Sequence, residues 1–253
     1  AFTLGAILLA VIARCAGERL DVAACERGPM LVAGLLTVFG FNVLTAFGQL
    51  LTETSKAAII AFTMPMWAAI MAAIFLGEKF GTNRIASLLL GMTGLAILLA
   101  GDFRNFIDHP AGFLFMLGAA VSWAAGTVLL KARAWTTTPL ARSAWLVGVS
   151  AVPAWAGAIM FEQPWTLELP GWPVVAVFAF HVVGPVALCY AAWVMLISRL
   201  PASTAAIGTL LIPVVGVLSS HLLLGDVMTW QKITGLGLIA ASVALTFIQP
   251  VRS

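Results

Sequence analysis

Long apolar runs, each bounded by charged or turn-forming residues, constrain the fold of this chain more than any other feature. Such runs predict spans at residues 2–13, 30–51, 57–76, 85–101, 112–130, 140–161, 172–197, 202–224 and 233–247. In lipid, every backbone polar group must be paired within the protein, so only helices and closed barrels cross a membrane. The runs lack the alternating pattern of a membrane β-barrel, and each is therefore predicted to be a transmembrane helix.

The composition supports this interpretation. The mean hydropathy is +1.06 and only 9% of the residues are charged, whereas a soluble domain carries about 25% charged residues. The chain is therefore predicted to be an all-α integral membrane protein. A net charge of +3 does not indicate nucleic-acid binding, because the Lys and Arg residues are spread singly over short loops.

An internal repeat organises the chain. The segment 55–100 recurs without a gap as segment 203–248, at a constant offset of 148 residues. Ala and Leu identities carry little weight in apolar sequence, whereas a proline and a Gly-acid pair at one offset carry much more. The most informative matches between the two copies are Pro65 with Pro213 and Leu76-Gly77-Glu78 with Leu224-Gly225-Asp226.

The number of spans predicts the topology. The second copy has five predicted spans and the first has four, and an odd number of spans inverts the second copy. We therefore expect ten transmembrane helices in two inverted five-helix repeats, at residues 1–101 and 112–253, with an external linker at 102–111. Segment 2–13 covers only about 20 Å of a core about 30 Å thick, so it is expected to be the end of a helix. Because the first copy has four spans and the second has five, the first helix is expected to be missing. A signal peptide is the alternative, but no basic region or cleavage site precedes Arg14.

The basic residues predict the orientation. Ten fall on one side of the predicted membrane and three on the other: Arg14, Arg19, Arg27, Lys79, Arg84, Lys131, Arg133, Arg142, Arg199 and Arg252 against Lys56, Arg104 and Lys232. The positive-inside rule then places the C-terminus in the cytoplasm. A bacterial inner (plasma) membrane is the expected location. The three cysteines, Cys15, Cys25 and Cys189, form no CxxC pair, and free thiols are expected.

Ionised groups are absent from the middle of every predicted span. A charge at the bilayer centre costs about 2.5–3.5 kcal/mol even on a lenient scale, so one that stays there usually has a function. The visible chain thus lacks the buried carboxylate of an ion-coupled pump and the buried cation that a phosphorylated substrate needs. His181 is the one titratable group predicted mid-span, and a hydrogen-bonded structural role outweighs a proton relay for a lone histidine.

Signatures of catalysis are absent as well. The sequence has no HExxH, no Asp-rich diphosphate motif and no CxxC, so no catalytic residue, metal or cofactor is expected. The pairs Gly77-Glu78 and Gly225-Asp226 fall at span ends. There the glycine can adopt the left-handed conformation and the acid can cap the next helix, which makes a structural role the favoured interpretation.

One polar face stands out in the second span. Asn42, Thr45 and Gln49 follow a helical spacing, and polar side chains within a membrane usually point toward protein or water. Interhelical hydrogen bonds that only hold a bundle together would explain this face equally well. The offset of 148 maps Asn42 and Thr45 onto Tyr190 and Trp193, which favours a cavity shared by the two repeats.

Prolines are expected to loosen three of the spans, at Pro65, Pro185 and Pro213. A straight helix would place His181 and Tyr190 on opposite faces. A common site for these two side chains therefore requires the helix to break at Gly184-Pro185.

These residues resemble the drug/metabolite transporter superfamily and, within it, the EamA-type exporters. The resemblance rests on the two halves, the proline-bearing helix that ends in Leu76-Gly77-Glu78-Lys79, its copy Leu224-Gly225-Asp226, and Ser122-Trp123 in the helix that opens the second half. The resemblance covers nearly the whole chain. Within the family, the chain looks most similar to amino-acid exporters. The resemblance implies ten helices, both termini in the cytoplasm and a central substrate cavity, but its motifs are specific for fold rather than substrate.

The predicted function is export of small zwitterionic metabolites, with amino acids, including aromatic ones, as the expected substrates. A cavity without formal charge can meet a carboxylate and an ammonium with amide, hydroxyl and indole groups. The candidate substrate-binding residues are Asn42, Gln49 and Tyr190 as polar contacts, Trp67, Trp123 and Trp193 as apolar walls, and His181 on the path. Export of other neutral metabolites or drugs, a non-transporting scaffold and a membrane-embedded enzyme are the alternatives.

Overall fold

A computed structural model describes residues 1–51, 60–79, 81–98, 110–161, 171–225 and 227–247. Within these ranges the chain is helical and has no strand. It forms two compact units: unit 1 comprises Ala1–Gly40 and Leu129–Arg199, and unit 2 comprises Phe41–Val128 and Leu200–Ser253. The predictions made for Ser55, for most of the linker and for Asp226 lie outside the described residues. The boundaries of the two sequence repeats stay a prediction.

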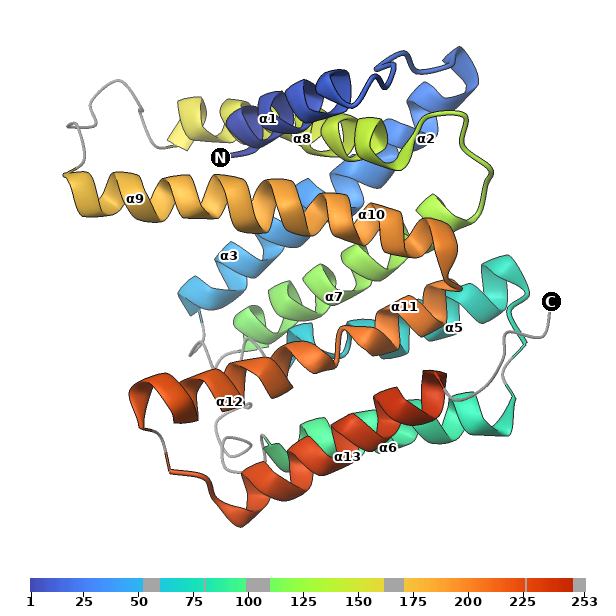
Figure 1. Cartoon of the computed structure of the whole chain (residues 1–253), viewed down its shortest axis with the longest axis vertical. Coiled ribbons are helices and arrows are strands. Elements are labelled where there is room, and N and C mark those ends of the chain that lie inside the picture. The colour runs from blue at the N-terminus through green and yellow to red at the C-terminus, as the bar shows by residue number, and fades with distance from the viewer. Residues whose placement is uncertain (52–59, 80, 99–109, 162–170, 226, 248–253) are drawn as a thin grey trace. The chain divides into compact units, whose positions relative to one another are not determined.

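Unit 1 contains helices from both sequence copies. They are α1 (Phe2–Cys15), α2 (Ala24–Gly34), η1 (Leu35–Gly40), α8 (Pro139–Phe161), α9 (Trp172–His181), η4 (Val182–Cys189) and α10 (Tyr190–Arg199). Helices α1 and α8 lie side by side, and α1 also packs on η4 (Figure 1). That packing is close at Gly5, where an added Cβ would lie 2.4 Å from a methyl carbon of Val186.

Unit 2 also draws on both copies. Its helices are α3 (Phe41–Leu51), α5 (Met64–Leu76), α6 (Thr82–Leu98), α7 (Pro110–Lys131, up to Val128), α11 (Ala202–Gly208), α12 (Leu211–Leu224) and α13 (Trp230–Phe247). Helices α6 and α13 lie side by side in Figure 1. Ile207, Leu210 and Ile239 form a buried apolar cluster, with Leu88 and Leu98 packed against it.

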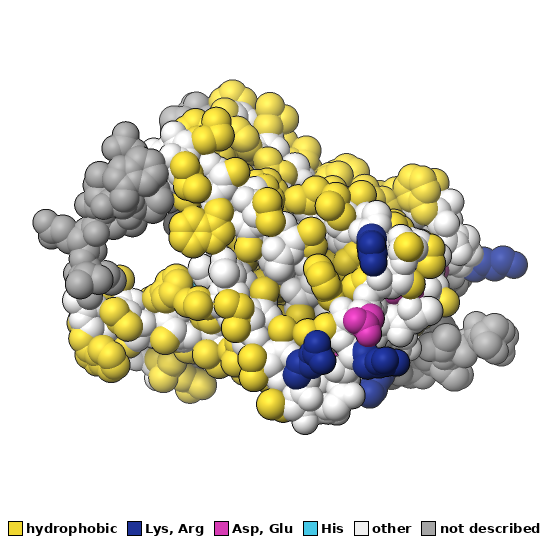
Figure 2. Space-filling view, turned by 90° about the horizontal axis from the view of Figure 1, so that it is seen from above, with side chains coloured by type: hydrophobic (Ala, Val, Ile, Leu, Met, Phe, Trp, Pro, Cys, Tyr) yellow, Lys and Arg dark blue, Asp and Glu magenta, His cyan; other side chains and the backbone are white. Residues whose placement is uncertain are grey.

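Membrane-spanning helices occur where the apolar runs predict them. Among the residues that the structure describes, five helices are long and apolar enough to cross a membrane, namely Ala24–Leu51, Pro110–Lys131, Pro139–Phe161, Trp172–Arg199 and Ala202–Leu223. Shorter apolar helices match three other runs, at Phe2–Cys15, Met64–Leu76 and Thr82–Leu98. Apolar side chains cover much of the surface in Figure 2, while charged side chains gather in part of it. This distribution suits helices that face lipid.

The offset of 148 recurs in the helix bounds. Added to Ala24 and Leu51, it gives Trp172 and Arg199, the two ends of the second 28-residue helix. Both helices contain a π-helical segment at the corresponding place, η1 and η4. The two copies therefore share an irregularity of the backbone as well as a hydropathy pattern.

The predicted break at Gly184-Pro185 is wrong in form, because the helix continues through this pair as η4. A π-helical turn absorbs a local disruption of the hydrogen-bond ladder without ending the helix. In the first copy Thr37 occupies the position of Pro185. Its hydroxyl donates to the carbonyl oxygen of Ala33 at 2.6 Å, so it also disturbs the ladder four residues back.

The two other prolines follow real interruptions. Turn residues separate the preceding helical turn from α5 at Phe62-Thr63 and α11 from α12 at Thr209-Leu210. At each interruption a threonine hydroxyl donates to the carbonyl three residues earlier, from Thr63 to Ile60 at 2.6 Å and from Thr209 to Ala206 at 2.7 Å. Near Pro65 and Pro213 the helix is therefore interrupted by turn residues, and a new helix begins, α5 in the first copy and α12 in the second.

Helices α6 and α13 meet through two contacts, and the offset of 148 converts the residue numbers of one contact into those of the other. Ser87 on α6 hydrogen-bonds Ser242 on α13, whose hydroxyl donates to the Ser87 carbonyl at 2.6 Å. Adding 148 to Ser87 and subtracting it from Ser242 gives Gly235 and Gly94, which also touch: a Cβ on Gly94 would lie 2.8 Å from the Gly235 carbonyl oxygen. The contacting residue on α13 moves from Ser242 to Gly235 as the residue on α6 moves from Ser87 to Gly94. The two helices are therefore antiparallel, as expected for inverted copies.

The glycines of the two Gly-acid pairs end helices in the predicted way, but Glu78 has a different partner. Gly77 and Gly225 adopt left-handed φ values of 64° and 74°, which glycine tolerates without strain. Glu78 was expected to cap the next helix. Instead its Oε1 accepts a hydrogen bond at 2.9 Å from the backbone N–H of Ala202, the first residue of α11.

Candidate functional site

The seven predicted substrate-binding residues fall in both compact units. Unit 2 holds Asn42, Gln49, Trp67 and Trp123, and unit 1 holds His181, Tyr190 and Trp193. Each group is described within its own unit. Their union as one site stays a prediction.

In unit 2, α7 provides the reference axis for the four side chains. Helix α3 runs antiparallel to it, because Phe47 stacks on Phe115 with ring centroids 5.5 Å apart and Leu44 reaches the surface of Gly118. The residue numbers in both pairs sum to 162. Asn42 therefore lies near the height of residue 120 on α7.

Helix α5 runs in the same direction as α7. Ile60, one turn before α5, packs on Met116, and Ala72 belongs to one buried cluster with Val128. Both pairs differ by 56 residues, so the height of Trp67 corresponds to that of Trp123. The structure thus brings Asn42, Trp67 and Trp123 to nearly the same level of unit 2.

Gln49 does not join this level. The same relation between α3 and α7 places it opposite residue 113, about 15 Å along the helix axis from Trp123. Its side chain is exposed, whereas Trp123 is 8% exposed. Gln49 therefore lies toward one end of unit 2.

Three buried polar atoms of unit 2 have no hydrogen-bond partner in the described part of the chain. They are the indole Nε1 of Trp67 and the hydroxyl oxygens of Thr45 and Thr127. Thr127 is completely buried and lies one turn after Trp123. A buried polar group without a partner is costly, so these groups are suited to hydrogen bonds with a solute.

Thr127 is not among the candidate site residues predicted from the sequence. Its spacing of four residues from Trp123 was the available signal. Burial without a partner becomes visible only in the structure.

In unit 1, Tyr190 links the two helices that contain π segments. Its hydroxyl donates to the carbonyl oxygen of Thr37 in η1 at 3.3 Å. Its own carbonyl oxygen accepts from the hydroxyl of Ser143 on α8 at 3.5 Å. Tyr190 is therefore held by contacts from η1 and α8, with Trp193 half-buried one turn further along α10.

His181 stands apart from Tyr190. It is the last residue of α9 and is exposed, and η4 separates it from Tyr190 by nine residues, about 13 Å of helix. The π segment does not bring the two side chains to one level, so the structure gives no common site for them.

Two buried charges occupy helix starts in unit 1. Glu26, in the first turn of α2, accepts hydrogen bonds from the backbone N–H of Thr136 and the hydroxyl of Thr137. The Arg142 guanidinium, in the first turn of α8, donates to the Thr137 carbonyl at 2.9 Å and lies 4.9 Å from the Trp135 ring centre. These contacts fix the α7–α8 connection and explain both charges structurally.

The sequence model of the EamA-like transporter family matches residues 1–100 and 110–248. An "Uncharacterized transporter YvbV" of Bacillus subtilis is 28% identical over 96% of this chain and 78% of its own length. A "Probable amino-acid metabolite efflux pump" of Salmonella typhimurium is 23% identical over 83% of this chain and 75% of its own length.

A solved structure shares the fold. A crystal structure of a protein with 22% sequence identity superposes with a TM-score of 0.84, over 98% of this chain and 86% of that one. At this identity the likeness concerns architecture alone.

Proposed function

The chain belongs to the EamA-like transporter family, and we propose that it exports small zwitterionic metabolites, amino acids including aromatic ones, across a bacterial inner membrane. The proposal rests chiefly on three polar groups of unit 2, the Trp67 indole and the Thr45 and Thr127 hydroxyls, which are buried without protein partners in the described ranges. The relative named as an amino-acid metabolite efflux pump supports the same substrate class.

The chemistry of these groups favours a zwitterion over an anion. The Trp67 indole N–H and the Thr127 hydroxyl can donate to a carboxylate, and the amide oxygen of Asn42 can accept from an ammonium. A doubly charged phosphate would lose its hydration without a compensating cation. Trp67 and Trp123 would lie against an aromatic side chain, each with a gain of about 0.5–1.5 kcal/mol beyond area burial.

Alternating access between the two repeats is the proposed mode of transport, with the C-terminus in the cytoplasm. The paired π segments η1 and η4 and the paired interruptions before Pro65 and Pro213 support it, because a helix bends most easily where its hydrogen-bond ladder is already disturbed. The proposed substrate contacts are Asn42, Thr45, Trp67, Trp123 and Thr127 of unit 2 with Tyr190 and Trp193 of unit 1. Gln49 and His181, which lie at other levels of their units, are proposed to line the path. The oligomeric state plays no part in this proposal.

Uptake into proteoliposomes tests the proposal. The purified chain would be reconstituted and offered a panel of radiolabelled amino acids, a sugar phosphate and a neutral amphipathic drug, with protein-free liposomes as the control. We expect time-dependent uptake of aromatic and large apolar amino acids and none of the sugar phosphate. Uptake of the drug alone would favour the alternative of a neutral-solute exporter, and a flat time course for every compound would favour a scaffold.

A further inference from the structure

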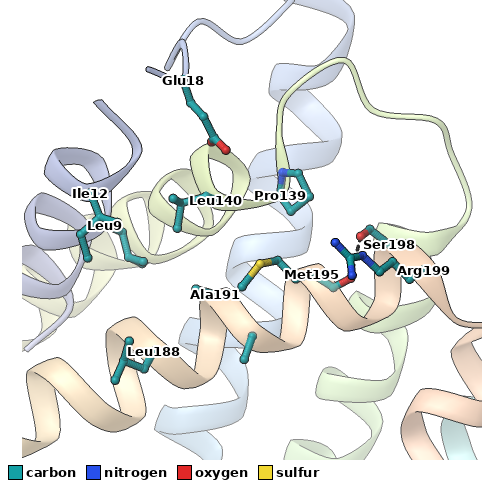
Figure 3. Close-up of a pocket in the computed structure, with 11 residues that line it drawn as sticks. Leu9, Ile12, Glu18, Pro139, Leu140, Leu188, Ala191, Met195, Ser198 and Arg199 are labelled. Carbon is teal, nitrogen blue, oxygen red and sulfur yellow. Dashed lines mark hydrogen bonds between the residues drawn. The ribbon is translucent and has the colours of Figure 1, made fainter. Parts of the chain in front are cut away.

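Unit 1 contains a groove. It has a volume of about 600 Å³ and is lined by Leu9, Ile12, Glu18, Pro139, Leu140, Leu188, Ala191, Ala192, Met195, Ser198 and Arg199. None of the seven candidate substrate residues is among them. Its walls come from α1, the start of α8, η4 and α10 (Figure 3).

The groove is apolar along most of its length. Leu9 and Ile12 of α1 face Leu188 and Met195 across it, and the side chains of Ile12, Leu188 and Met195 are all exposed (Figure 3). From Leu188 to Arg199 the wall follows 11 residues of helix, a length of about 16 Å. A groove of this length and polarity suits an acyl chain.

The polar lining residues gather where three helices end. Helix α1 ends at Cys15, three residues before Glu18, α8 begins at Pro139, and α10 ends at Arg199. Helix ends of a membrane protein lie near the interface, where lipid headgroups are found. The charged end of the groove is therefore at headgroup depth.

Two opposite charges face this end without neutralising each other. In the described part of the chain neither Glu18 nor Arg199 forms an ion pair. The Glu18 carboxylate accepts one hydrogen bond, from the Thr138 hydroxyl, which leaves its other oxygen available. Figure 3 shows Glu18 and Arg199 entering the groove from different sides.

We propose that this groove binds a phospholipid with a primary-amine headgroup, of the phosphatidylethanolamine type. One acyl chain lies along Leu188 and Met195, the Arg199 guanidinium binds the phosphate, and the Glu18 carboxylate accepts hydrogen bonds from the ammonium. Arginine matches phosphate geometry with its forked donors, and a carboxylate binds an ammonium through charge-assisted hydrogen bonds.

The charge pattern distinguishes among lipid headgroups. A choline headgroup carries the same charge but has no N–H to donate, so the Glu18 contact would be weaker. A glycerol headgroup leaves the lipid anionic and offers Glu18 no cation. The groove should therefore prefer ethanolamine to choline and choline to an anionic phosphatidylglycerol.

Native mass spectrometry of the delipidated full chain tests this proposal. Dioleoyl phosphatidylethanolamine, phosphatidylcholine and phosphatidylglycerol would each be titrated, with glycerophosphoethanolamine as a competitor that lacks acyl chains. Arg199→Gln removes the phosphate contact, Glu18→Gln the ammonium contact, and Ala192→Trp fills the groove from its exposed side. Arg14→Gln is the matched control, because Arg14 is an exposed arginine in the last turn of α1 that does not line the groove.

We expect one ethanolamine lipid to bind tightly to the parent and to Arg14→Gln, with affinity about fivefold or more lower in Arg199→Gln. Ala192→Trp should lose the lipid, and Glu18→Gln should bind ethanolamine and choline lipids equally. Size-exclusion profiles identify any variant that fails to fold, and the other two still decide the outcome. Equal binding of ethanolamine lipid by the parent, Arg199→Gln and Ala192→Trp, a preference for phosphatidylglycerol, or full competition by glycerophosphoethanolamine would each overturn the proposal.

Discussion

Glu78 accepts a hydrogen bond at 2.9 Å from the backbone N–H of Ala202, although 124 residues separate them. Its other carboxylate oxygen accepts from the Ser203 hydroxyl, and Arg84 lies 3.5 Å from that oxygen. The first N–H groups of a helix have no partner within the helix, so the carboxylate supplies what the start of α11 lacks. A helix end in the first copy is thereby fastened to a helix start in the second.

Loss of this cap should lower stability. We expect Glu78→Ala to cost about 1 kcal/mol, because it leaves the Ala202 N–H and the Ser203 hydroxyl unpaired, and Glu78→Gln to cost less, because an amide oxygen still accepts. Thermal unfolding in detergent measures the effect, with Asp21→Ala as the control at an exposed acid. An unfolding temperature of Glu78→Ala equal to that of the control would contradict the capping role.

The contact between α6 and α13 predicts opposite outcomes for two glycines of one helix. A Cβ on Gly235 would lie 2.6 Å from Leu98 Cγ and 2.9 Å from the Gly94 carbonyl oxygen, whereas at Gly237 no atom lies within 4 Å among the residues described. Gly235→Ala should destabilise the protein by about 1–3 kcal/mol through overpacking. Gly237→Ala should be neutral or stabilise by about 0.5–1 kcal/mol, since alanine favours a helix.

Unfolding temperatures of these two variants, measured against the parent in one detergent, check the prediction. The two substitutions add the same methyl group to the same helix, so helix propensity cancels between them. Equal shifts for Gly235→Ala and Gly237→Ala would show that the close approach of α6 and α13 has no energetic consequence.

The positions of the helices followed from the sequence because hydropathy is a local property. The run 172–197 predicted the helix Trp172–Arg199, whereas the run 30–51 predicted its counterpart Ala24–Leu51 only in part, because that helix begins at Ala24. Polar residues before Met30, including Glu26 and Arg27, hid the first turn of α2. Burial of Glu26 against Thr136 and Thr137 explains how a carboxylate is tolerated there.

Features that depend on tertiary partners did not follow from the sequence. The partner of Glu78 is distant in the chain, and the capping motif gave only its local role. The π segment η1 has no proline to signal it. The repeat indicated η1 indirectly. Thr37 occupies the position of Pro185 in the first copy, and its hydroxyl disturbs the backbone hydrogen bonds of the helix. A common site for Tyr190 and His181 requires a sharp kink at Pro185, and the helix instead continues through this residue as η4.

Orientation in the membrane can be tested by cysteine labelling. Because α6 and α13 are antiparallel, the loops before them lie at opposite ends of the pair. We expect Lys79→Cys, in a background where the three native cysteines are replaced, to react with an impermeant maleimide only from the cytoplasmic side. Lys232→Cys should react only from outside. Labelling of both from one side of the membrane would contradict the inverted repeat.

Substitutions in each unit test the proposed site. Trp123→Ala and Tyr190→Ala should each reduce transport of tryptophan or phenylalanine at least several-fold, while the protein still inserts and purifies normally. Tyr190→Phe removes the hydroxyl that donates to the Thr37 carbonyl but keeps the ring, and it should have a smaller effect. Trp172→Ala is the control, because Trp172 is 78% exposed at the start of α9. Parental rates in both alanine variants would identify these side chains as packing residues.

Thr127 offers a more specific test of the buried polar groups. Thr127→Val keeps the shape of the side chain and removes its hydroxyl, which has no partner in the described ranges. If the hydroxyl binds substrate, transport should fall while the unfolding temperature stays equal or rises, since no internal hydrogen bond is lost. A lower unfolding temperature with unchanged transport would instead indicate a structural role.

Counterflow of radiolabelled tryptophan in proteoliposomes tests the central claim most directly. Vesicles preloaded with unlabelled tryptophan should accumulate the label transiently above protein-free vesicles. Excess phenylalanine should abolish this accumulation, whereas tryptamine, which lacks the carboxylate, and glucose 6-phosphate should leave it nearly intact. Absence of counterflow for every amino acid, or inhibition by glucose 6-phosphate as strong as that by phenylalanine, would contradict the assignment of this chain as an exporter of zwitterionic amino acids.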